Sequence, residues 1–211
     1  MEQESYTKNK KTAVLSLSGG LDSTSLLLHL LNNSYNVYGL TFNYGQRHNL
    51  EIEKAKNNIA LLQSFNFNIK HQVIDISDCI NILSSSLTNQ NIDIPEGHYE
   101  EESMKSTVVP NRNAIFASII YGYALSIFKK INSPIHVALG VHAGDRTIYP
   151  DCRKEFYIKI MDAFKEGNWD SDKISLYLPY INLNKSKILK DAIIYTIFED
   201  PRFGYKSRPS K

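Results

Sequence analysis

The chain has 211 residues, enough for one domain with a sizeable buried core. Its 24 Lys and Arg nearly balance its 22 Asp and Glu, which argues against a protein that binds nucleic acid or a membrane surface. Two cysteines, Cys79 and Cys152, make no disulfide framework, and the polar start MEQESYTKNKK lacks the apolar region of a signal peptide. We therefore expect a cytoplasmic protein with no membrane span.

Strand and helix patterns alternate from residue 12 onward. TAVLSLS, residues 12–18, is a short apolar run that ends in Gly-Gly, as a buried strand does. Leucines at helical spacing predict a helix over 21–31, and β-branched and aromatic residues predict a strand over 36–44. A second helix is predicted over 48–62 and a third strand over 69–77.

A long polar stretch over residues 84–108 interrupts this alternation. Loops of that length in compact domains are usually functional, as a lid or a dimer arm would be, or disordered. The helix predicted next, over 114–130, is apolar around most of its circumference, so we expect it to be well buried. The remaining predictions are a strand over 134–141, an amphipathic helix over 151–167, a possible edge strand over 174–180 and a last helix over 184–198.

Strands that alternate with helices favour the α/β class, with a parallel twisted sheet and helices on both faces. Ligands of such sheets bind at the carboxyl ends of the strands. We expect a flexible tail over 1–11, an α/β domain over 12–190 and a divergent, partly helical C-terminal segment over 191–211.

The segment SGGLDST, residues 18–24, lies where the first strand ends and the first helix begins. Gly19 and Gly20 let the main chain approach a ligand closely, and the helix start points free N–H groups at the same place. Ser18, Ser23 and Thr24 add hydroxyl groups, which together predict a cradle for a phosphate-like anion. The segment is neither a Walker A loop nor a GxGxxG fingerprint.

Asp22 stands inside this predicted anion site. A carboxylate there would repel phosphate unless a cation intervened, so Asp22 is best explained as a ligand of a phosphate-bound Mg²⁺. The alternative is a simple Gly-Gly turn with Asp22 as the helix cap. The hydroxyl groups beside it favour the phosphate site.

Four motifs carry a resemblance to a known family. SGGLDST resembles the pyrophosphate-binding loop (PP-loop) of the ATP pyrophosphatases, which split ATP into AMP and pyrophosphate to adenylate an oxygen. With YGQRHNLEI (44–52), VPNRN (109–113) and GVHAGDRTIYPDCRKEF (140–156), the chain is similar to the 7-cyano-7-deazaguanine synthases of queuosine biosynthesis over about residues 12–190. The fold implied is adenine nucleotide alpha hydrolase-like, a Rossmann-like arrangement.

This resemblance implies an ATP-dependent C–N ligase that uses ATP and Mg²⁺. Its substrates would be 7-carboxy-7-deazaguanine and ammonia, and its product 7-cyano-7-deazaguanine (preQ0), with AMP- or ADP-type products and pyrophosphate or phosphate released. Adenylation gives the carboxylate a leaving group, ammonia attack gives an amide, and adenylation of the amide oxygen lets AMP depart and leaves the nitrile. Such chemistry needs neutralisation of phosphate charge more than a covalent nucleophile.

The resemblance also assigns residues to roles. Catalytic roles fall on Asp22, Ser23, Arg47 and Arg112. Contacts with ATP fall on Ser18, Gly19, Gly20, Leu21, Asp22, Ser23, Thr24 and Lys185. Contacts with the deazaguanine substrate fall on Arg47, His48, Asn111, Arg112, Asp145, Tyr149, Asp151 and Arg153.

Several of these roles have alternatives. Arg47 could hold a carboxylate or a phosphate bidentately, or be a surface charge at a helix start. Asp145 could accept hydrogen bonds from a guanine edge or bind Mg²⁺, and Tyr149 could stack on a purine. Lys185 could contact a phosphate or be a solvated helix-end charge. Cys152 is read as structural or substrate-lining, because adenylate chemistry needs no thiolate.

The chain departs from the family pattern after residue 190. Family members normally end in a segment with four cysteines that bind a structural zinc, and none follows here. Cys79 and Cys152 cannot build a four-ligand site alone, so zinc is not predicted. Two alternatives therefore stay open: a relative that passes the adenylated acid to another amine, for instance on a protein, and an inactive nucleotide-binding protein. We also expect a homodimer.

Overall fold

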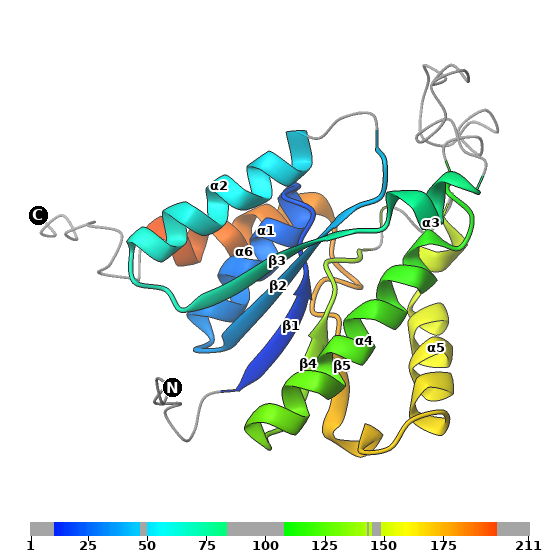
Figure 1. Ribbon diagram of the computed structural model, residues 1–211. Coiled ribbons are helices and arrows are strands. Elements are labelled where there is room, and N and C mark those ends of the chain that lie inside the picture. Colours follow the sequence, from blue (N-terminus) through cyan, green and yellow to red (C-terminus); the bar gives the residue numbers. More distant parts are fainter. Residues whose placement is uncertain (1–10, 47–49, 84–107, 143, 145–148, 198–211) are drawn as a thin grey trace, which may run out of the picture.

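The computed structural model describes residues 11–46, 50–83, 108–142, 144 and 149–197. At its centre lies a five-stranded sheet in which every neighbouring pair is parallel, in the order β3-β2-β1-β4-β5 (Figure 1). The strands are β1 (Thr12–Ser16), β2 (Asn36–Asn43), β3 (Ile69–Asp75), β4 (Ile135–Ala138) and β5 (Ile174–Tyr177). The predicted parallel sheet is confirmed, and 174–177 is its edge strand.

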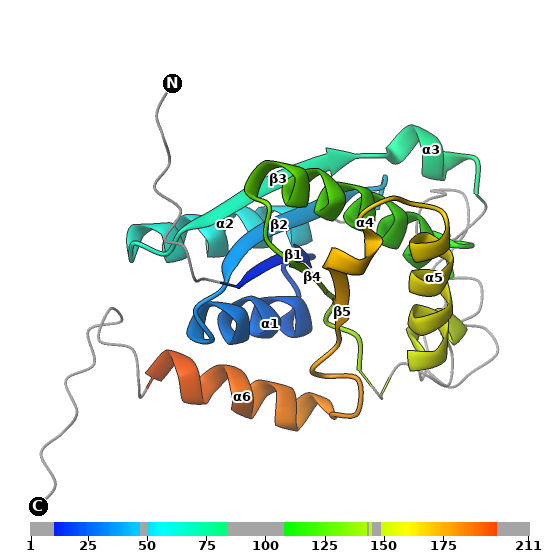
Figure 2. The same ribbon diagram turned by 90° about the horizontal axis from the view of Figure 1, so that it is seen from below.

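Helices cover both faces of this sheet, as predicted (Figures 1 and 2). One face carries α1 (Leu21–Asn32), α2 (Leu50–Ser64) and α6 (Lys185–Ile197). The other carries α4 (Arg112–Ile131) and α5 (Lys154–Glu166). A short helix that the sequence did not indicate, α3 (Ser77–Asn81), follows β3.

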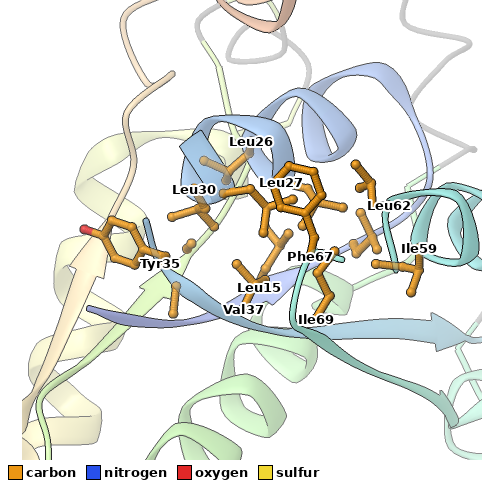
Figure 3. Close-up of a cluster of buried hydrophobic side chains, with 14 of the residues drawn as sticks. Leu15, Leu26, Leu27, Leu30, Tyr35, Val37, Ile59, Leu62, Phe67 and Ile69 are labelled. Carbon is orange, nitrogen blue, oxygen red and sulfur yellow. The ribbon is translucent and has the colours of Figure 1, made fainter. Parts of the chain in front are cut away.

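The two faces have separate hydrophobic cores because successive strand residues point to opposite sides of a sheet. Leu15 of β1 packs under Leu26, Leu27 and Leu30 of α1, all with no exposed surface (Figure 3). Its neighbour Val14 belongs to the core under α4 and α5. Full burial of each such side chain contributes about 1.5–3 kcal/mol, so these strands are fixed firmly beneath the site.

Helix α4 is less buried than its composition suggested, and that prediction was wrong. Among the described residues it is the one helix long and apolar enough to cross a membrane, yet only 28% of its most apolar window is buried. One side packs on the sheet through Ala117, Ile120, Tyr121, Ala124 and Ile127. A single layer of helices leaves the outward side of α4 uncovered by described residues.

Some helices and strands begin or end at residues other than those predicted. The helix predicted over 151–167 divides into a 3₁₀ turn, Pro150–Cys152, and α5, because Arg153 between them is extended with φ −83° and ψ 146°. The strand predicted over 134–141 ends at Ala138. The domain boundary proposed at residue 190 falls inside α6, which packs along α1.

Candidate active site

The predicted anion loop joins β1 to α1 at the carboxyl edge of the sheet. Gly19 has φ +83°, which favours glycine, and a Cβ built there would lie 2.3 Å from the Glu51 carbonyl oxygen and 2.7 Å from the Ala55 nitrogen. Gly19 is therefore required both for the turn and for the close approach of α2. The next residue, Gly20, is the N-cap of α1 and supplies no side chain to close the helix start.

Two serines hold the loop in shape. The hydroxyl groups of Ser18 and Ser23 lie 3.0 Å apart, and the Ser18 N–H donates to Ser23 Oγ at 3.2 Å. The Gly20 N–H donates to Ser18 Oγ, and Ser23 Oγ–H donates to the Gly20 carbonyl oxygen, both at 3.2 Å. These bonds give the start of α1 a fixed hollow toward which its first N–H groups point.

Asp22 does not cap the helix, since α1 has no side-chain cap hydrogen bond. Its Oδ2 lies 3.4 Å from Nε2 of His142, a side chain only 1% exposed. Its Oδ1 is buried and has no hydrogen-bond partner among the described residues. A buried carboxylate oxygen left open in this way suits a cation ligand.

A cavity of about 290 Å³ opens beside the loop, where β1 and β4 end. The strand order reverses between these two strands, which is where ligands bind in open α/β sheets. The cavity wall combines loop residues with residues of five other segments: Ser16, Ser18, Gly20, Asp22, Ser23, Glu51, Asn113, Phe116, Ala117, Leu139, Gly140, Val141 and Tyr157.

Phe116 and Tyr157 give the cavity wall aromatic faces, and Arg112 and Tyr44 lie beside Phe116 without lining the cavity. The Arg112 guanidinium lies over the rings of Tyr44, at 5.4 Å, and Phe116, at 6.0 Å, and donates a long hydrogen bond of 3.4 Å to the Tyr44 hydroxyl. Its buried Nε has no hydrogen-bond partner among the described residues. Burial raises the pKa of Tyr157 far above its usual value, so its phenol stays a neutral donor. The wall thus offers a hydroxyl group and aromatic faces, and a cation lies beside it.

The comparisons with known proteins identify the family to which these features belong. Residues 12–200 match the model of the queuosine biosynthesis protein QueC family. The chain belongs to this family. It is 43% identical over 180 residues to the 7-cyano-7-deazaguanine synthase of Pseudoalteromonas translucida, covering 85% of this chain and 77% of the relative. It is 43% identical over 181 residues to that of Methanoregula boonei, covering 86% and 78%.

Solved structures show the same fold at low sequence identity. A 4-thiouridine synthetase–RNA complex with bound ATP gives a TM-score of 0.53 at 16% identity, covering 88% of this chain and 40% of the other. A predicted subunit of a tRNA methyltransferase from Methanocaldococcus jannaschii gives 0.51 at 17% identity, covering 87% and 74%. These matches support the α/β architecture of the QueC-family chain and nothing finer.

The fold brings some of the predicted site residues together. Ser18, Gly20, Asp22 and Ser23 line the cavity. Thr24 accepts a hydrogen bond of 3.3 Å from Asn58 of α2, behind the loop. The predicted residues that are described but do not line the cavity are Gly19, Leu21, Thr24, Asn111, Arg112, Tyr149, Asp151, Arg153 and Lys185. Arg47, His48 and Asp145 lie outside the described residues, as does most of the polar stretch 84–108.

Other cavity residues were missed by sequence reasoning. Glu51, Asn113, Phe116 and Tyr157 come from three different helices and read along the sequence as ordinary surface or core positions. Glu51 lies in the motif YGQRHNLEI and Asn113 in VPNRN, so these motifs were the sequence signal that could have identified both residues. His142 also lies within a motif, GVHAGD, in which Asp145 was the predicted substrate residue.

Proposed function

We propose that this QueC-family chain converts 7-carboxy-7-deazaguanine and ammonia into 7-cyano-7-deazaguanine with ATP. The observation that supports this most strongly is the cavity itself. One end is an anion hollow at a helix start, and the other has aromatic and amide groups, so ATP phosphates and a planar acid could meet in it. The family relationship names the reaction.

The chemistry follows from what each end of the cavity can hold. The N–H groups at the start of α1 would bind ATP phosphate oxygens, with Ser18 and Ser23 holding the loop in place. The substrate carboxylate oxygen attacks the α-phosphorus and pyrophosphate leaves; ammonia then displaces AMP to give the amide. A second ATP adenylates the amide oxygen, and loss of AMP and a proton leaves the nitrile.

Asp22 would hold the Mg²⁺ that accompanies ATP. Its Oδ1 is buried without a hydrogen-bond partner among the described residues, and carboxylate oxygen is the ligand that Mg²⁺ prefers. Bound there, Mg²⁺ would neutralise part of the phosphate charge. The residues present therefore fit the cation.

We expect no stoichiometric zinc in this chain. The sequence has two cysteines, of which Cys79 is exposed and Cys152 is buried, and the described residues hold no group of three side chains suited to a metal. Elemental analysis of the purified chain should find well under one zinc per molecule, and chelators should leave its melting temperature unchanged. About one tightly bound zinc per chain would refute this expectation.

The remaining parts of the proposal concern setting and assembly. We propose a cytoplasmic enzyme, since its substrates are small metabolites, and a homodimer that pairs through the outward side of α4, where small residues are exposed. Asp145, Arg47 and His48 keep their proposed substrate roles from the family motifs. Lys185 keeps its proposed phosphate role at the exposed start of α6.

The deciding experiment incubates the purified protein with 7-carboxy-7-deazaguanine, ATP, Mg²⁺ and ammonium and follows the products by mass spectrometry. Nitrile formation that depends on both ATP and ammonium supports the proposal. Pyrophosphate release without nitrile would indicate a different acceptor, and absence of any ATP turnover would indicate a nucleotide-binding protein only.

A further inference from the structure

His142 is a buried side chain that has no role in the proposed reaction. It follows β4 on a short segment that runs back over the start of α1. The ring is 1% exposed, and its two nitrogens face different neighbours: Nδ1 faces the Gly144 N–H at 3.0 Å, and Nε2 faces Asp22 Oδ2 at 3.4 Å. The ring therefore bridges its own segment and the PP-loop helix.

The contact with Gly144 fixes the proton on the ring. A backbone N–H can only donate, so Nδ1 must accept and carries no proton. In a neutral imidazole the proton then lies on Nε2, the atom that faces Asp22. The Nε2–H group therefore faces the carboxylate at 3.4 Å, and Nε2 is unsuited to binding a metal.

Two glycines allow this close packing. A Cβ at Gly144 would lie 2.8 Å from Cε1 of His142, and a Cβ at Gly140 would lie 3.2 Å from the Asp22 carbonyl carbon and the Ser23 nitrogen. A side chain at Gly140 would push the segment away from the loop, and one at Gly144 would displace the His142 ring. The glycines of the GVHAG segment thus hold the imidazole against Asp22.

We propose that His142 is a positioning residue that orients the Asp22 carboxylate for the cation of Mg·ATP. The Nε2 side of the ring faces Oδ2 across 3.4 Å, a polar contact whose geometry falls short of a hydrogen bond, and this contact leaves Oδ1 for the cation. Fixing a ligand through such an outer contact is how proteins orient metal-binding side chains. The inference deepens the proposed function and rests on its assignment of Asp22.

Two amide replacements test the idea with matched chemistry. His142→Gln can place an amide N–H near the position of Nε2, whereas His142→Asn, one methylene shorter, reaches only as far as Nδ1. Calorimetry with Mg·ATP should show Asn weakening binding about tenfold or more, as expected for a lost bond to a charged group. Gln should stay within about threefold of the wild type by the same reasoning.

A double-mutant cycle separates positioning from general damage. In an Asp22→Ala background, His142→Asn should cause no further loss of Mg·ATP affinity, because the carboxylate it orients is gone. If His142→Asn fails to fold, Gly144→Ala displaces the ring while leaving its chemistry intact and should also weaken binding. Equal affinities for the Gln and Asn variants, or additive losses in the cycle, would overturn the proposal.

Failure of the role proposed for His142 can be distinguished from failure of the proposed enzymatic function. A wild-type protein that binds Mg·ATP but forms no nitrile refutes the function, while the affinity cycle still decides the role of His142. A nitrile-forming wild type whose His142→Asn variant keeps full Mg·ATP affinity refutes the role of His142 alone.

Discussion

Ser18 and Ser23 show how much of the loop is organised by its own residues. Their hydroxyl groups bond to each other and to backbone groups of the loop, so its shape does not depend on a bound phosphate. A hollow formed in advance loses little conformational freedom on binding and can stabilise charge as it develops. Oδ1 of Asp22, also in this loop, has no hydrogen-bond partner among the described residues.

Asp22→Asn should lower ATP-dependent turnover about hundredfold or more, because the amide has the same shape but supplies no charge for the cation. Its melting temperature should stay close to that of the wild type, since no helix cap is lost. Steady-state pyrophosphate release and differential scanning fluorimetry measure the two quantities. Asp162→Asn, an exposed change on α5, is the control, and turnover of Asp22→Asn at wild-type level would remove Asp22 from the site.

The loop could be predicted from sequence because its residues are contiguous. SGGLDST carries its turn, its hydroxyl groups and its carboxylate within seven positions. The opposite wall could not, because Phe116 and Tyr157 meet the loop only through packing of α4 and α5 on the sheet. Nothing in a helical apolar position tells whether it faces a core or a cavity.

At the scale of elements, strand identity was predictable and helix burial was not. Buried parallel strands are continuous apolar runs, which can be recognised in the sequence. Burial of α4 depends on how many layers of structure cover it, and amino-acid composition does not show this number. The 3₁₀ turn at Pro150–Cys152 was also hidden, because the extended Arg153 that ends it has no sequence signature.

Helix α6 is joined to the rest of the fold by a polar network. Asp191 Oδ2 lies 3.0 Å from His29 Nδ1 of α1 and accepts a hydrogen bond of 2.8 Å from the Tyr180 hydroxyl. The other nitrogen of His29, Nε2, lies 2.8 Å from the hydroxyl of Tyr177, at the end of β5. One carboxylate thus links α6 to α1 and to the segment after β5.

Asp191→Ala should destabilise the fold by about 1–3 kcal/mol, because it leaves two partly buried groups without their acceptor. Urea denaturation followed by circular dichroism gives the free energy of unfolding. Asp162→Ala, an exposed change on α5, should cost much less. An Asp191→Ala variant as stable as this control would mean that apolar packing alone holds α6.

Two strand histidines should make stability depend on pH. Burial, with a smaller effect of Lys56, lowers the pKa of His71 below 6.5. Burial also lowers the pKa of His136; a hydrogen bond to the Thr12 backbone opposes this effect, and Lys11 adds to it. The unfolded chain therefore binds more protons below pH 6.5, and stability falls as the pH decreases from there toward the folded-state pKa values. Melting temperatures from about pH 8 to 5 should show this fall. A His71→Gln/His136→Gln variant should show a flatter profile, and an unchanged slope would contradict the assignment.

At the scale of the whole molecule, the strand order determines where chemistry can occur. β2 and β3 lie on one side of β1, and β4 and β5 lie on the other, so segments leaving β1 and β4 diverge at the carboxyl edge. The PP-loop follows the first of these strands and the His142 segment follows the second. The cavity is therefore a consequence of topology, with the motifs supplying its chemistry.

The outward side of α4 is the contact that we expect for the proposed homodimer. Ser118, Gly122 and Ser126 form an exposed stripe of small residues at helical spacing, flanked by the partly exposed Ile115 and Ile119. This helix has a mean hydropathy of 1.4 over a window that is only 28% buried in the single chain. A second copy packed on the small residues would also cover the half-buried apolar side chains beside them.

Gly122→Lys tests this contact cleanly, because a Cβ at Gly122 meets nothing within 4 Å and the single-chain fold can accept the side chain. At a close helix–helix contact, however, the lysine would bury a charge, which costs free energy unless a partner neutralises it. Light scattering after size exclusion should therefore find a dimer for the wild type and a monomer for Gly122→Lys. Leu61→Lys, an exposed change on α2 across the sheet, should leave the dimer intact. A wild-type monomer, or a Gly122→Lys dimer, would exclude this side of α4 as the interface.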